Sequence, residues 1–129
     1  MRRGVLAFTM TVMVVGASVA IYGGDVISQS QSGEMQLQLA HEFFREGRFS
    51  DALEAYQKAL KAGPPIDGRA ARSGVVQSAL RVAEFGLART EAATLLAESP
   101  EDPSAIALDG DALWASGLFE EAESRYRDA

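Results

Sequence analysis

A phenylalanine followed three residues later by an alanine recurs along this chain, and it limits the fold more than any other feature. The copies are Phe49 with Ala52, Phe85 with Ala88, and Phe119 with Ala122, separated by 36 and then 34 residues. Self-similarity at a period of 20 to 50 residues is typical of arrays in which one small structural unit stacks on the next. The sequence therefore predicts a repeat protein.

Each copy has the pattern of two helices joined by a short break. In the first copy, apolar residues at helical spacing lead up to Phe44, and the chain breaks at Gly47. We predict a second helix that begins near Ser50, with Ser50 as its N-cap, and that ends at Gly63 and the prolines after it. The small residues Ala52, Ala88 and Ala122 are predicted to lie where the two helices of a hairpin approach most closely.

These residues resemble the tetratricopeptide repeat family. The matching residues of the first copy are Leu39, Ala40, Phe43, Gly47, Phe49, Ala52, Tyr56, Ala59 and Pro64, and those of the third are Gly110, Leu113, Gly117, Phe119, Ala122, Tyr126 and Ala129. The middle copy is degenerate. The resemblance implies an all-α fold, a right-handed superhelical stack of about three antiparallel helix hairpins (an α-solenoid) over residues 34–66, 69–102 and 103–129. The third unit lacks a terminal capping helix, which such stacks ordinarily carry. We therefore expect that it docks on something or that the protein continues.

The N-terminal segment predicts export. Residues 4–22 carry no charge and follow Arg2 and Arg3, and 19 residues of helix extend about 28 Å, close to a bilayer core. Residues 1–23 are therefore expected to be an apolar helix that acts as a signal anchor or as a signal peptide cleaved after Ala20. The Gly- and Ser-rich residues 24–33 are expected to form a flexible tether. Because the arginines stay inside, the repeats are expected on the extracytoplasmic side of the cell envelope.

Composition argues against most chemistry. Arg2 and Arg3 aside, 10 basic residues face 18 acidic ones, a formal charge of −8 that disfavours a nucleic-acid partner. The chain has no cysteine and one histidine, so cysteine chemistry and His-based triads are not expected. Asp109, Asp111 and Glu120 have the spacing of a calcium loop, but apolar residues occupy its fifth and sixth positions. We expect no enzymatic activity, no cofactor and no metal.

A binding surface remains. Residues three and four apart on the first helix of each unit share one face, which the resemblance implies is the concave, partner-binding face. The candidate groove residues are His41, Phe44, Arg45, Gln77, Leu80, Arg81, Asp111 and Trp114. An alternative is that Phe44 and Trp114 only pack against the neighbouring hairpin. Leu37, His41, Ser73, Gln77, Ala107 and Asp111 stand where some family members grip a C-terminal carboxylate with Lys and Asn, so an Hsp90-type partner is not expected.

Three functions stay open at this point. The first is a membrane-tethered or exported scaffold that binds a peptide or protein partner. The second is the N-terminal arm of a larger enzyme or envelope-assembly protein that continues past residue 129. The third is a structural protein that self-associates through its uncapped C-terminal hairpin.

Overall fold

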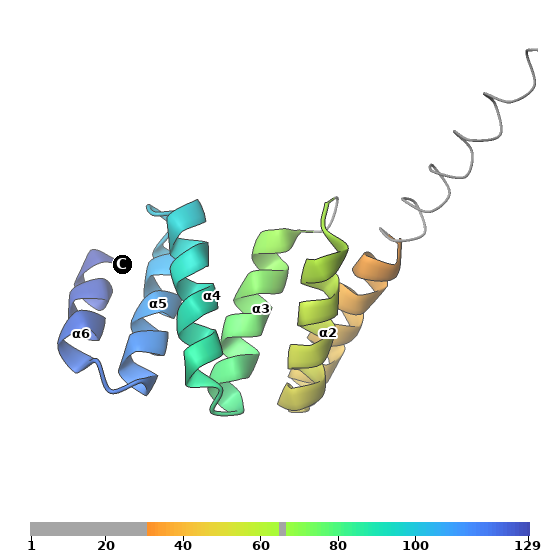
Figure 1. Cartoon of the computed structure of the whole chain (residues 1–129), viewed down its shortest axis with the longest axis horizontal. Coiled ribbons are helices and arrows are strands. Elements are labelled where there is room, and N and C mark those ends of the chain that lie inside the picture. Colours follow the sequence, from red (N-terminus) through yellow and green to blue (C-terminus); the bar gives the residue numbers. More distant parts are fainter. Residues whose placement is uncertain (1–30, 65–66) are drawn as a thin grey trace, which may run out of the picture.

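The computed structural model describes residues 31–64 and 67–129, and all the elements it describes are helices. Residues 31–45 are helical. They are followed by α2 (Phe49–Ala62), α3 (Gly68–Arg81), α4 (Phe85–Glu98), α5 (Pro103–Ala115) and α6 (Phe119–Asp128). Figure 1 shows these helices side by side in one row, each running back along the one before. The predicted all-α stack of helix hairpins is confirmed.

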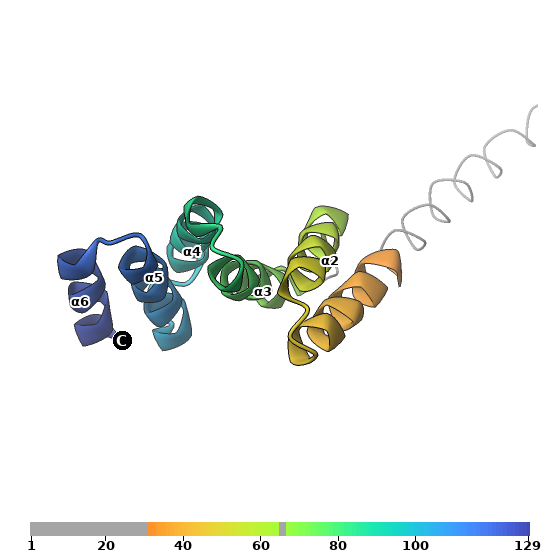
Figure 2. The same ribbon diagram turned by 90° about the horizontal axis from the view of Figure 1, so that it is seen from below.

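The row has two sides. In Figure 2, α2 and α4 lie on one side, and the helix over residues 31–45 and α3 lie on the other. Helix α3 packs against α2, α4 and also α5, so the first helices of neighbouring hairpins touch directly. A surface built by these first helices is therefore continuous from one hairpin to the next.

Small residues fill the helix crossings, as predicted. Ala52, Ala88 and Ala122 have no solvent exposure at all. Two core clusters run through the stack, one around Ala52 and Tyr56 and the other around Ala88 and Val76. Because these interiors are close-packed, a larger side chain at an alanine position has no space to occupy.

The three hairpin turns use the same hydrogen bond. An amide just past the helix donates to a carbonyl five residues earlier, from Arg48 to Phe43, from Glu84 to Ala79 and from Leu118 to Leu113. This closure places the residue before the amide in the left-handed region, where glycine is preferred. Gly47 and Gly117 have φ angles of 77° and 81°, whereas the middle turn holds Ala83 at 63°. The middle hairpin is therefore strained where the other two are relaxed.

Two predicted boundaries are corrected. Helix α2 begins at Phe49, and Ser50 lies inside its first turn, so Ser50 is not the N-cap. The residue that precedes α2 is Arg48, which makes no capping hydrogen bond. Residues 31–33, assigned above to a tether, are already helical. Helix α5 begins at Pro103, the first residue of the expected third unit, and Asp102 caps it by accepting from the Ser104 amide.

The predicted membrane-targeting helix over residues 4–22 lies outside the described residues, as does most of the predicted tether. Within the part of the chain that the structure describes, no helix combines the length and the apolar character needed to cross a bilayer.

Candidate functional site

An open groove of about 480 Å³ lies between the helix over residues 31–45 and α3. It is lined by His41, Phe44, Arg45, Tyr56, Ala70, Ser73, Gly74 and Gln77. Four of these are predicted site residues, namely His41, Phe44, Arg45 and Gln77. Tyr56 comes from α2 and is only 3% exposed, so it forms the floor of the groove.

The Tyr56 ring is held in one position. Its hydroxyl lies 2.8 Å from Nδ1 of His41, and the two rings meet edge-on with centroids 5.4 Å apart. On the other side of the ring is Gly74 of α3, where an added Cβ would lie 2.3 Å from Tyr56 Cε1. Burial raises the pKa of Tyr56 above its ordinary value, so the floor stays an uncharged phenol. The absence of a side chain at residue 74 lets α3 approach closely and defines the depth of the groove.

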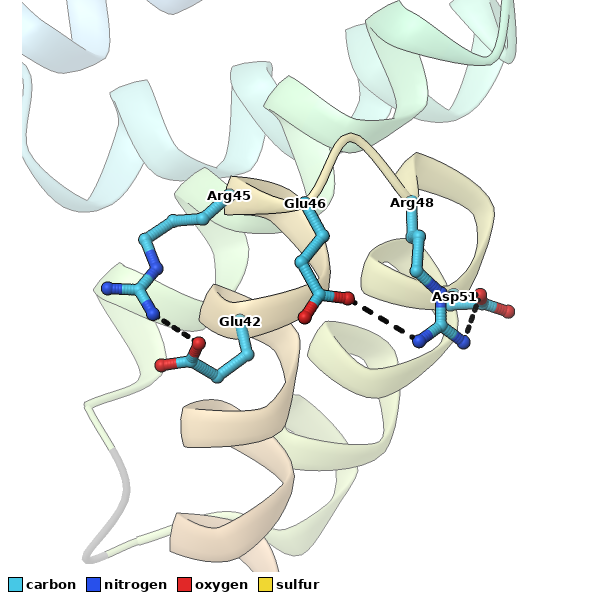
Figure 3. A network of polar contacts seen from close by, with 5 residues as sticks. All are labelled: Glu42, Arg45, Glu46, Arg48 and Asp51. Carbon is cyan, nitrogen blue, oxygen red and sulfur yellow. Dashed lines mark hydrogen bonds and ion pairs between the residues drawn. The ribbon is translucent and has the colours of Figure 1, made fainter.

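Arg45 stands at the rim of the groove. Figure 3 shows its guanidinium pointing toward Glu42, with which it forms an ion pair one helical turn away. Both side chains are more than half exposed, and exposed ion pairs of this kind add little stability. Nearby, Arg48 bridges Glu46 at 3.5 Å and Asp51 at 2.7 Å. Arg45 can therefore exchange its intrahelical partner for an incoming carboxylate at small cost, while Arg48 braces the turn.

Arg81 and Leu80 belong to α3 but are not among the residues that line the groove. The Arg81 guanidinium is 5.0 Å from the centre of the Phe49 ring, and Phe49 in turn meets Phe44 edge-on at 5.2 Å. Phe44 both lines the groove and packs against the first core cluster. Leu80 packs against the second core cluster. Ring contacts thus link Phe44, which lines the groove, through Phe49 to Arg81.

The last two predicted residues belong to the third hairpin and do not line this groove. Asp111 accepts a hydrogen bond of 2.8 Å from the Tyr126 hydroxyl. Trp114 is 55% exposed and meets Phe119 edge-on at 4.8 Å. Trp114 therefore contacts the phenylalanine of its own hairpin, in the same arrangement as Phe44 and Phe49.

Tyr56, Ser73 and Gly74 were not among the predicted site residues. Tyr56 is part of the apolar stripe of α2, so the sequence pattern indicates only that its side chain is buried. A signal was present in the repeats, because a polar residue precedes a tyrosine by 15 positions twice, at His41 with Tyr56 and at Asp111 with Tyr126. Gly74 has no such signal, since only the approach of α3 to α2 reveals why it lacks a side chain.

No metal-binding arrangement is found in the described residues, where no group of three or more histidine, aspartate or glutamate side chains is gathered. Asp109, the first position of the calcium-loop spacing, instead accepts from Arg125 Nε at 2.7 Å.

Comparison with known proteins supports the fold assignment. No protein-family model and no curated protein matches the sequence. Among solved structures, the first tetratricopeptide repeat (TPR) domain of Spaghetti (RPAP3), bound to the HSP90 peptide SRMEEVD, is similar with a TM-score of 0.67 and 21% identity, over 77% of each chain. The first TPR domain of human RPAP3, solved by NMR, has a TM-score of 0.67 and 19% identity, over 77% of this chain and 76% of that one. The second TPR of Spaghetti, bound to the same peptide, has a TM-score of 0.68 and 18% identity, over 85% and 94%. The chain has the tetratricopeptide-repeat fold.

Proposed function

We propose that this protein is a non-enzymatic scaffold that binds an extended segment of a partner protein. The observation that carries the proposal is the groove between the helix over residues 31–45 and α3, which places His41, Phe44, Arg45 and Gln77 around one open space. The solved TPR domains that resemble it hold a peptide, which supports this use of the fold.

The side chains of the groove indicate the kind of peptide. Gln77 is exposed, and its amide can donate to and accept from a peptide backbone. Phe44 offers an aromatic surface for an apolar side chain, and Arg45 offers a cation for a carboxylate. We therefore propose a ligand with one apolar and one acidic side chain, in extended form.

Selection of peptides on the full chain tests the proposal. Peptides selected from a random library should bind the Gln77→Ala variant and the Arg45→Ala variant at least fivefold more weakly. Gln57→Ala, a change of the same residue type on α2 outside the groove, is the matched control and should leave affinity unchanged. Equal affinity for all four proteins would contradict binding in this groove.

We further propose that residues 4–22 attach the scaffold to a membrane, or direct its export, with the repeats on the extracytoplasmic side. The uncharged run behind Arg2 and Arg3 motivates this. A fusion of residues 1–35 to a reporter that is active only outside the cytoplasm should be active. Activity only of a cytoplasmic reporter at the same junction would overturn the proposal.

Self-association is a second candidate function, and one observation favours it. Tyr56 is covered by the next hairpin and is 3% exposed, whereas its counterpart Tyr126 is 41% exposed. Phe119, seven residues earlier on the same helix, is 54% exposed. An exposed aromatic surface of this kind is typical of interaction sites. Sedimentation of the full chain, compared with Phe119→Ser, should show association that the substitution weakens, and identical monomers would contradict it.

A further inference from the structure

A second groove, of about 550 Å³, lies away from the candidate site. Its walls are α4 and α6, and α5 runs beneath them. The side chains that matter here are Arg89 and Thr90 on α4, Asp109 and Leu113 on α5, and Glu121 and Arg125 on α6. Two hairpins meet at this groove, so the corresponding junction between α2, α3 and α4 provides an internal comparison.

The two junctions have opposite chemistry at equivalent positions. The repeat spacings of 36 and 34 residues place Arg89 where the first junction has Leu53, and Glu121 where it has Leu87. In the first junction Leu53 and Leu87 both pack against the core clusters on either side. Asp109 likewise takes the place of Val75, which is 1% exposed. Three apolar side chains therefore occupy the first junction, whereas charged side chains stand at all three equivalent positions of the second.

The charges of the second groove are only partly satisfied within the protein. Asp109 is nine-tenths buried, and its Oδ2 accepts from Arg125 Nε at 2.7 Å. Arg89 and Glu121 form no ion pair with any residue in the described ranges. One wall thus offers a free guanidinium and the other a free carboxylate. A ligand complementary to both must carry one negative and one positive group.

We propose that this groove is a second binding site, and that its ligand is an extended peptide with an acidic and a basic side chain two positions apart. In an extended chain, such side chains point the same way and are separated by roughly 6–7 Å. The acidic side chain pairs with Arg89 and the basic one with Glu121. Leu113 provides the apolar surface beneath the residue between them. The site lies on different helices from the groove of the proposed function and does not depend on it.

A peptide titration on the isotope-labelled full chain in detergent micelles tests this inference. The probe is acetyl-Glu-Ala-Lys-amide, and the comparison peptide is acetyl-Gln-Ala-Gln-amide. The charged probe should shift the amide resonances around Arg89 and Glu121 in a saturable way, and the neutral peptide should bind at least tenfold more weakly. Equal shifts with both peptides, or shifts spread over the surface, would overturn the inference.

Two substitutions copy the first junction into the second and make the test sharper. Arg89→Leu and Glu121→Leu restore the residue types of positions 53 and 87, and each should abolish saturable binding of the charged probe. The double variant is expected to fold, because Arg89 and Glu121 are both exposed and neither forms an ion pair within the described residues. Arg127→Leu removes a charge that faces Glu123 on α6 outside the groove, and it should leave binding unchanged. Retained binding in the double variant would contradict the assignment.

Discussion

Replacement of Gly74 by alanine should destabilise the protein, although the same change usually stabilises a helix. Residue 74 lies in the interior of α3, where alanine is favoured over glycine by about 0.8–1 kcal/mol in helix propensity. The added Cβ, however, would lie 2.3 Å from the Tyr56 ring. Because Tyr56 is 3% exposed and hydrogen-bonded to His41, its ring cannot move aside without disturbing the core or breaking that hydrogen bond. Overpacking of a core costs about 1–3 kcal/mol.

Loss of the bond between His41 and Tyr56 adds about 1 kcal/mol to that cost. Against the gain in propensity, Gly74→Ala should therefore lower the free energy of unfolding by about 1–3 kcal/mol. Each kcal/mol corresponds to about 4–8 °C in the melting temperature of a domain near this size. Thermal and urea denaturation followed by circular dichroism measure the effect.

Gly110→Ala is the matched control. Its Cβ would lie 2.7 Å from the Tyr126 ring, but Tyr126 is 41% exposed and can turn into solvent. Gly110→Ala should therefore be close to neutral. In a Tyr56→Leu background, where the ring is absent, Gly74→Ala should no longer destabilise. The reasoning is refuted if Gly74→Ala raises stability by the about 1 kcal/mol that helix propensity alone predicts.

Three other predictions concern the core, the middle turn and the third hairpin. Ala52→Leu should lower the free energy of unfolding by about 1–3 kcal/mol, because Ala52 is fully buried at a helix crossing, and an unchanged melting transition would contradict that packing. Ala83→Gly should stabilise the protein by about 0.5–1 kcal/mol and Gly47→Ala should destabilise it, since both residues have positive φ. Destabilisation by Ala83→Gly together with stabilisation by Gly47→Ala would refute the strain at the middle turn. Burial and then the hydrogen bond and negative charge of Asp111 raise the pKa of Tyr126 to about 12 from an ordinary value of 10.0. The stabilisation linked to this proton is therefore fully present below pH 10 and is lost as the pH rises toward 12, a loss that Tyr126→Phe should reduce in alkaline denaturation.

The repeat could be predicted from sequence because its signal depends on sterics alone. Only small residues fit where helices cross, so Ala52, Ala88 and Ala122 recur and all three are fully buried. The turn glycines Gly47 and Gly117 could be predicted because the turn needs a positive φ, which glycine adopts most easily. The structure places Ala83 at the equivalent position of the middle turn, with the same hydrogen bond. Repeated features can be predicted from sequence because the same residue type recurs at equivalent positions in several copies.

The site was predicted only in part because the groove lies between two hairpins, and its lining depends on how these two hairpins pack together. Helical spacing places His41, Phe44 and Arg45 on one face, and in the structure these three and Gln77 line the same groove. Spacing cannot reveal that Gly74 admits the Tyr56 ring, nor that Trp114 turns onto Phe119. Such contacts depend on how closely two helices approach, which no single helix determines.

The central claim is that the groove between the helix over residues 31–45 and α3 holds an extended peptide. Chemical-shift mapping of the labelled full chain carrying Arg89→Leu and Glu121→Leu, which removes the two charges of the second groove, with a peptide selected on that variant tests it most directly. The account predicts that the largest changes occur at His41, Phe44, Arg45 and Gln77, with small changes on α6. Changes concentrated on α6 or α4, with those four residues unaffected, would contradict it.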